Sequence, residues 1–182
     1  LLLLDEPTSN LDKNLRVQDL ARANQLQPNA QLRPGQRLVL PVPGGSQAQW
    51  GRPRTPGILQ LMRQGAREGG RSRFLDKKGR VRPQAVPVLA DLMRQTPTGS
   101  ESRKPNARLM QQLARISDHF GGRRITIISG FRNAGGYTRE SSRHVRGDAV
   151  DIRIEGVPIT AIRDYCQSLP NMGCGYYPRS QF

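Results

Sequence analysis

The chain has 182 residues and carries 29 Lys and Arg against 14 Asp and Glu, a formal net charge of +15. Hydrophobic residues make up 35% of the sequence, which favours one ordinary domain with a smaller module and connecting segments over a single large core. No run of eighteen apolar residues occurs, so we expect no transmembrane segment.

The basic residues are concentrated in the middle of the chain. Residues 50–124 contain 17 of the 29 Lys and Arg but only 5 of the 14 Asp and Glu. Such a region attracts polyanions, which could be anionic wall polymers or membrane-surface head groups, or it is simply a solvated Arg-rich surface. Because aromatic residues make up only 5% and no motif that reads bases occurs, we do not expect nucleic acid as a partner.

The first twelve residues read LLLLDEPTSNLD, an apolar run that ends in two acids. This segment resembles the Walker B strand and D-loop of ABC-transporter ATPases. The resemblance implies that Asp5 would hold magnesium, Glu6 would polarise the attacking water and Asp12 would lie in the D-loop. The sequence contains no GxxxxGK[ST] phosphate loop and no LSGGQ-type signature, so we interpret residues 1–14 as an ATPase-like remnant.

Residues 15–42 have the pattern of a helix, a loop and a short strand. Asn24 suits the helix end, Pro28-Asn29 and Pro34-Gly35 indicate turns, and residues 37–40 could form a strand. The segment resembles the second half of a LysM domain, a module that binds N-acetylglucosamine-containing chains. Since the first strand and helix of that family are missing, we expect a partial module that is not stable alone.

Residues 43–57 are rich in Gly, Pro, Ser and Gln, which predicts a flexible linker before a domain over residues 58–182. Within that domain, residues 58–120 are predicted to be mostly helical. The first helical stretch begins at Ile58, a turn or hairpin surrounds Lys78-Gly79, and longer helices lie near 83–95 and 105–120. His119, near the end of the last helix, is interpreted as a cation favoured at a helix C-terminus and not as a metal ligand.

The candidate metal-binding residues follow a strand rich in β-branched side chains at 124–129. A Gly-rich loop leads to SSRHVRGDAVDIRI, whose residues 149–154 alternate like a second strand. His144 lies on a turn and Asp151 on this strand, and Gly147 lets the backbone bend so that both side chains converge. An imidazole and a carboxylate are suitable zinc ligands when a third protein ligand and a water complete the site.

SGFR followed by S-R-H-x-x-G-x-A-x-D, together with GCGYYPRSQF at residues 173–182, resembles the D-Ala-D-Ala carboxypeptidase and hedgehog-type zinc superfamily, in particular its YcbK-like branch. The resemblance implies an α+β domain with an antiparallel sheet and flanking helices. It implies zinc bound by His144 and Asp151, with Arg132 facing the substrate and Ser142 supporting the site. The third ligand, a His in F-V-H-x-D, and the general base are expected beyond residue 182. The domain is therefore interpreted as truncated, and the fragment as inactive by itself.

These features predict a zinc-dependent peptidase that acts on peptidoglycan stem peptides or cross-links, is tethered by LysM, and is periplasmic or secreted. The alternatives are a non-catalytic peptidoglycan-binding protein and, from the first residues alone, an ABC ATPase fragment. Cys166 and Cys174 could be a disulfide or two free thiols, and the extracytoplasmic interpretation favours the disulfide. Asp148 and Glu155 are interpreted as surface charges.

Overall fold

The computed structural model describes residues 20–21, 24–36, 38, 47–96, 99–180 and 182. The chain divides into two compact units, residues 1–42 and residues 43–182. No helix among the described residues is both long and apolar enough to cross a membrane. The predicted ATPase-like remnant, residues 1–14, lies outside the described residues.

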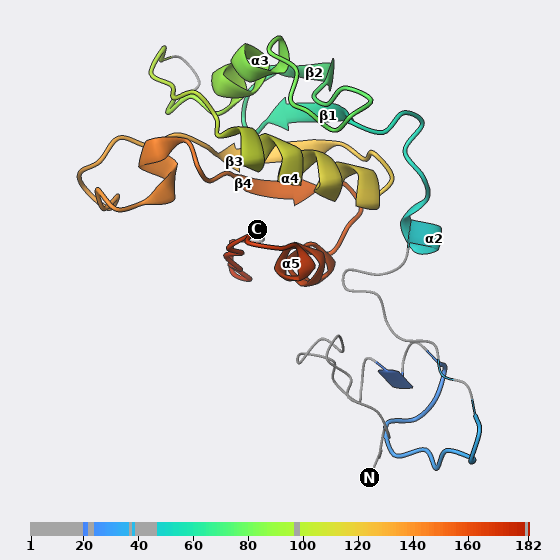
Figure 1. Cartoon of the computed structure of the whole chain (residues 1–182). Coiled ribbons are helices and arrows are strands. Elements are labelled where there is room, and N and C mark those ends of the chain that lie inside the picture. Colours follow the sequence, from blue (N-terminus) through green and yellow to red (C-terminus); the bar gives the residue numbers. More distant parts are fainter. Residues whose placement is uncertain (1–19, 22–23, 37, 39–46, 97–98, 181) are drawn as a thin grey trace. The chain divides into compact units, whose positions relative to one another are not determined.

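The second unit is built on a four-stranded sheet with the order β2-β1-β3-β4 (Figure 1). The strands are β1 (Ile58–Arg63), β2 (Gly69–Arg73), β3 (Ile125–Ser129) and β4 (Asp151–Ile154). The predicted pairing of 124–129 with 149–154 is confirmed, because β3 and β4 are antiparallel neighbours. The prediction of an antiparallel sheet is wrong, since β1 and β3 are parallel and the sheet is mixed.

The parallel pair has a simple cause in the order of the chain. After the β1–β2 hairpin, two helices carry the chain back before β3 begins, and such a crossover connection is what parallel neighbours require. The prediction that the region begins with a helix at Ile58 is also wrong. In β1 the side chains of Leu59, Leu61 and Arg63 are buried in alternation with more exposed neighbours, which is the period of a strand.

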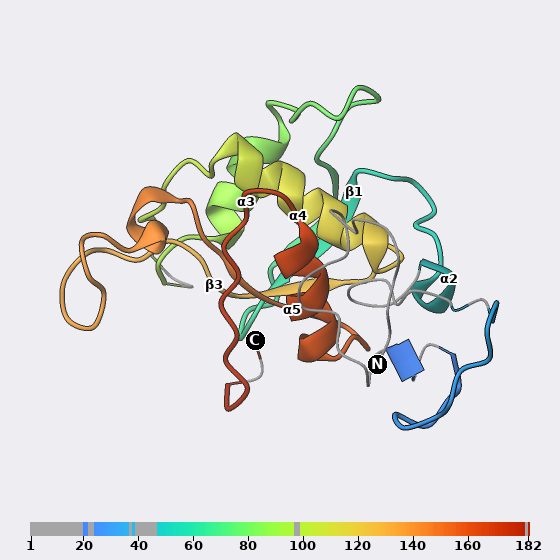
Figure 2. The same ribbon diagram turned by 60° about the horizontal axis from the view of Figure 1, so that its bottom comes forward.

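Three helices complete the core of this unit. They are α3 (Ala85–Leu92), α4 (Ala107–His119) and α5 (Ile159–Ser168). The first two agree with the helices predicted near 83–95 and 105–120, and the predicted turn at Lys78-Gly79 is present between the bridge partners Leu75 and Val81. Helices α4 and α5 pack against each other, as Figure 2 shows from below.

An aromatic cluster joins the start of the unit to the helices. Trp50, the last residue of the short helix α2 (Gln47–Trp50), meets the fully buried Phe120 edge-on at 5.4 Å between ring centroids. Phe120 also contacts Tyr165 of α5, whose ring stacks on His119 at 3.6 Å. Within the segment predicted as a linker, Trp50 is therefore packed against the second unit.

In the first unit, the predicted turns at Pro28-Asn29 and Pro34-Gly35 are present. Gly35 has φ of 78° and the Gln36 amide donates to the Arg33 carbonyl at 3.0 Å, which is the geometry of a tight turn. Asn24 follows the helical residues Leu20 and Ala21, and its amide donates to the Leu20 carbonyl. The predicted strand at 37–40 lies outside the described residues except for Leu38.

Replacing Phe120 with Ala should lower the free energy of unfolding by about 3–5 kcal/mol, because the change leaves a cavity among Trp50, Tyr165 and the core. Urea unfolding followed by tryptophan fluorescence measures this loss, and Trp50 is the sole tryptophan of the chain. Val88→Ala, at a side chain that is 39% exposed, is the control and should change stability little. Equal stability of the Phe120 and Val88 variants would contradict this account of the core.

Candidate active site

The turn that carries His144 is fixed to the start of α4. His144 lies on the 3-10 helix η1 (Arg143–Arg146), which ends at Gly147 with φ of 73°. The amide of Asn106, the residue that caps α4, donates to the Gly147 carbonyl at 3.1 Å, and the Asn106 side chain accepts from the Arg108 amide. A β-carbon on Gly147 would lie 2.8 Å from the Lys104 carbonyl oxygen, so this close approach requires glycine.

The orientation of the His144 ring is set by the backbone of the segment after β3. Nδ1 of His144 lies 2.6 Å from the Gly130 carbonyl oxygen. Because a carbonyl oxygen can only accept, Nδ1 carries the proton and donates. In the neutral ring, the lone pair is then on Nε2, which is the arrangement of a histidine prepared to bind a metal.

That lone pair faces the carboxylate of Asp151, the first residue of β4. His144 Nε2 and Asp151 Oδ1 are 3.6 Å apart, and each side chain is only 14% exposed. This distance is too long for a good hydrogen bond. With zinc bonds of about 2.0–2.2 Å, two ligand atoms of a tetrahedral site lie roughly 3.4 Å apart. The donor types and their separation therefore fit two of the ligands of a zinc ion.

Arg132 is the third side chain at this place, and it binds the other oxygen of the Asp151 carboxylate. Its Nη2 donates to Asp151 Oδ2 at 2.6 Å, and its Nε donates to the Ser129 hydroxyl at 2.8 Å. The Arg132 side chain remains 41% exposed, so one face of the guanidinium is open to a ligand. Ser129 and Gly130 were not predicted as site residues, although both belong to the SGFR motif on which the resemblance to the zinc superfamily rests.

The other residues singled out from the sequence lie around this group in different roles. The Ser142 hydroxyl accepts from the His144 amide at 3.3 Å and so caps η1. Asp148 is paired with Arg146 and Glu155 with Arg124, so both carboxylates are engaged in ion pairs. His119 lies at the end of α4 against Tyr165 and not with His144. No cluster of three His, Cys, Asp or Glu suited to a metal occurs among the described residues.

Cys166 and Cys174 are free thiols in this structure, where the sequence analysis favoured a disulfide. They nevertheless contact each other. The hydrogen bond with Cys174 and burial raise the pKa of the Cys166 thiol. The hydrogen bond from Cys166 lowers the pKa of Cys174, and the nearby Arg163 acts in the same direction.

The mixed sheet thus brings an imidazole, a carboxylate and a guanidinium together at one place in the second unit. Residues 52–182 match the protein family described as peptidoglycan L,D-endopeptidase MepK, and residues 11–41 match the LysM domain. The chain belongs to this MepK family and carries a LysM match before the family domain. Residues 1–10 of the ATPase-like remnant lie outside both matches.

Curated relatives agree with this family. The chain is 30% identical over 154 residues to the peptidoglycan L,D-endopeptidase MepK of Escherichia coli K12, which covers 79% of this chain and 82% of that protein. It is 35% identical over 111 residues to the probable peptidoglycan L,D-endopeptidase MepK of Haemophilus influenzae, covering 55% of this chain and 59% of that protein. No solved structure matched significantly.

Gly147→Ala should lower the free energy of unfolding by at least about 1–2 kcal/mol, because the left-handed backbone disfavours a side chain and the β-carbon meets the Lys104 carbonyl. Gly173→Ala is the matched control, since no atom lies within 4 Å of the position that its β-carbon would take and its φ is not positive. Urea unfolding curves measure both. If the two variants unfold at the same urea concentration, the tight attachment of η1 to α4 is not present in solution.

Proposed function

We propose that this protein is a zinc-dependent peptidase that cleaves the peptide part of peptidoglycan. The observation that carries the proposal is the approach of His144 Nε2 and Asp151 Oδ1 to 3.6 Å, with Arg132 held on the second carboxylate oxygen. Membership of the MepK family and the names of the relatives support an L,D bond as the one that is cleaved.

In this proposal His144 and Asp151 hold the ion, and a third ligand comes from the histidine of an F-V-H-x-D motif, as the family resemblance implies. Bound zinc would supply a water that ionises near neutral pH and a Lewis acid for the scissile carbonyl. The Gly130 carbonyl keeps the proton on His144 Nδ1, and Ser129 orients Arg132. The exposed side of Arg132 would bind an oxyanion or carboxylate of the substrate, which suits the planar guanidinium.

The first test measures zinc affinity and cleavage of an L,D-cross-linked muropeptide, both in this chain and in one extended by a segment with the F-V-H-x-D motif. The extension should raise zinc affinity and give cleavage, because a third protein ligand strengthens binding. His144→Ala should remove metal and activity together. Arg132→Ala should retain metal and lose turnover, and Arg139→Ala, at an exposed arginine of the same loop, should retain both.

Two outcomes decide between this proposal and its alternative. Zinc binding that is unchanged when both His144 and Asp151 are replaced by Ala would falsify the assignment of the ligands. An extended chain that binds peptidoglycan but neither binds zinc nor cleaves the muropeptide would favour a non-catalytic wall-binding protein.

The LysM match supports a second part of the proposal, which is that residues 11–41 contribute to attachment on the glycan strands of the wall. A peptidoglycan substrate implies a periplasmic or cell-wall location. In such an oxidising compartment, we also propose that Cys166 and Cys174 form a disulfide. Each thiol would lose one proton and one electron to a thiol–disulfide oxidant, and the lowered pKa of Cys174 makes it the thiolate that reacts first.

The mass of protein exported to the periplasm should therefore be lower, by two hydrogen atoms, than the mass of the same protein after reduction. Intact mass spectrometry under non-reducing and reducing conditions measures this difference, and Cys174→Ser is the control that should abolish it. Two freely alkylated thiols in the exported, unreduced wild-type protein would show that the bond does not form.

A further inference from the structure

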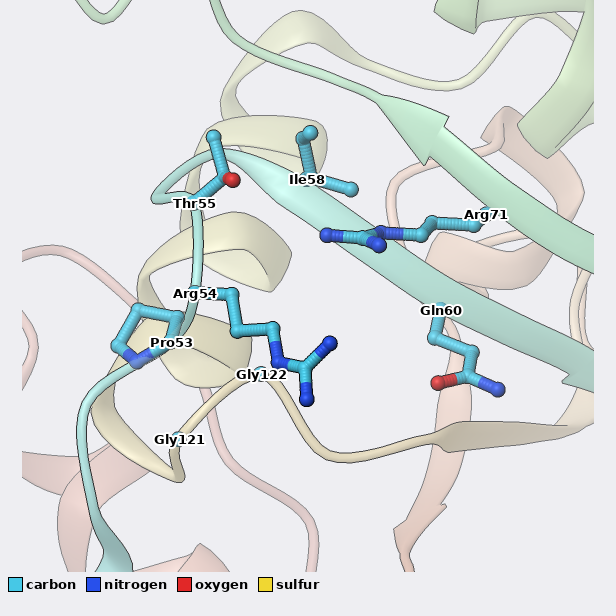
Figure 3. Close-up of a pocket in the computed structure, with 8 residues that line it drawn as sticks. All are labelled: Pro53, Arg54, Thr55, Ile58, Gln60, Arg71, Gly121 and Gly122. Carbon is cyan, nitrogen blue, oxygen red and sulfur yellow. The ribbon is translucent and has the colours of Figure 1, made fainter.

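Among the residues that the structure describes, two arginines without a carboxylate partner share a pocket at the end of the sheet opposite to His144. The pocket has a volume of about 270 Å³ and is lined by the segment before β1, the neighbouring positions of β1 and β2, and the turn after α4 (Figure 3). In Figure 1 the start of β1 and the η1 turn lie at opposite ends of the second unit. The parallel pairing explains this, because β3 runs away from the pocket toward the metal-ligand candidates.

The donors of this pocket come from two elements. Gln60 and Arg71 are register partners in the β1–β2 hairpin, so their side chains lie on one face of the sheet. Burial alternates along β1, and Leu59 and Leu61 face the core, so Gln60 points away from it. Arg54 approaches from the segment before the strand, and Figure 3 shows both guanidinium groups and the Gln60 amide around the same space.

The segment that carries Arg54 is held in place by packing. Trp50 lies against Phe120 at 5.4 Å and under the guanidinium of Arg123 at 5.8 Å. A β-carbon on Gly122 would lie 3.2 Å from Pro53, so the segment and the turn are in close contact. A backbone fixed on both sides lowers the ordering cost of binding a ligand through Arg54.

The charged side chains that line the pocket are both arginines. None of the residues that line it is Asp or Glu. In the part of the chain that the structure describes, neither Arg54 nor Arg71 forms an ion pair, whereas Arg80, Arg94 and Arg132 each do. Outside the lining, the Asp118 carboxylate accepts from the Gly57 amide at 3.0 Å, and Glu155 pairs with Arg124 at 2.9 Å.

We infer that this pocket binds a phosphoryl group, as a site distinct from the proposed peptidase centre. Two guanidinium forks that approach from different elements match an anion with tetrahedral oxygens and two charges better than a planar, singly charged carboxylate. The volume lies below the range of roughly 300–1,000 Å³ that larger organic ligands occupy, which also favours a compact anion. Phosphoryl groups of this kind occur on lipid head groups and on soluble phosphorylated polymers.

The experiment titrates the full chain with inorganic pyrophosphate while ¹H–¹⁵N spectra are recorded. The expected result is a saturable shift of the amides of Thr55, Gln60 and Gly122, with affinity reduced at least tenfold in R54Q/R71Q. The matched control is R67Q/R115Q, which removes two exposed arginines away from the pocket and leaves the same net charge. The spectra also report whether each variant is folded.

Equal weakening of pyrophosphate binding in both double variants, or no saturable shift at these amides, would overturn the site, because the electrostatic field of a chain with charge +15 would then explain any binding.

A second arm uses vesicles with and without phosphatidylglycerol. Binding to the anionic vesicles that R54Q/R71Q weakens and pyrophosphate displaces identifies a lipid head group as the source. Pyrophosphate binding without vesicle binding identifies a soluble phosphorylated ligand. Neither arm depends on zinc or on cleavage, so the site and the peptidase proposal can fail separately.

Discussion

The close packing of Gly130 against Met93 determines where the residues of the candidate site can lie. A β-carbon on Gly130 would be only 2.5 Å from three atoms of Met93, and the Phe131 amide donates to the Met93 carbonyl at 2.6 Å. The chain after β3 is therefore fixed on the end of α3. The Gly130 carbonyl then points to His144 Nδ1, and Arg132 follows two residues later. One backbone contact thus sets both the tautomer of the imidazole and the starting point of the guanidinium.

Two buried arginines lie beside that contact at the end of α3. Arg63, the last residue of β1, donates to the Leu92 carbonyl at 3.0 Å, and burial lowers the pKa of its guanidinium. Arg94 is 8% exposed and is paired with Glu68 and Asp91. Because a buried charge that loses its partner destabilises a protein strongly, the contacts of Arg63 and Arg94 favour this position of α3 on the sheet. Because Arg63 lies on the strand that pairs with β3, the parallel β1–β3 ladder and the position of Met93 are linked.

Elements and site residues could be predicted from the sequence where a short stretch of it carries their pattern. The helices α3 and α4 have apolar residues at helical spacing, and β3 is rich in β-branched residues, so all three were predictable from short windows. The pattern ILQLMR of β1 suits a strand or a short amphipathic helix, and the polar, Gly-rich β2 has no strand signal. His144, Asp151 and Arg132 were found through motif spacing. Ser129 and the Gly130 carbonyl act through contacts that only the fold creates.

The ion pair between Arg132 and Asp151 bears on how the site could serve both a metal and a substrate. The two oxygens of the Asp151 carboxylate have different partners. Oδ2 accepts from Arg132 at 2.6 Å, and Oδ1 lies 3.6 Å from His144 Nε2. Oδ1 could therefore bind a metal ion while Oδ2 stays in the ion pair with Arg132. The guanidinium in turn offsets part of the negative charge of the carboxylate, and its side chain is 41% exposed. Since Ser129 holds Nε, rotation away from Asp151 would break two hydrogen bonds at once. Arg132 is thus held next to His144 and Asp151 by two hydrogen bonds, and this is the preorganisation that its proposed role, the stabilisation of a developing oxyanion, would require.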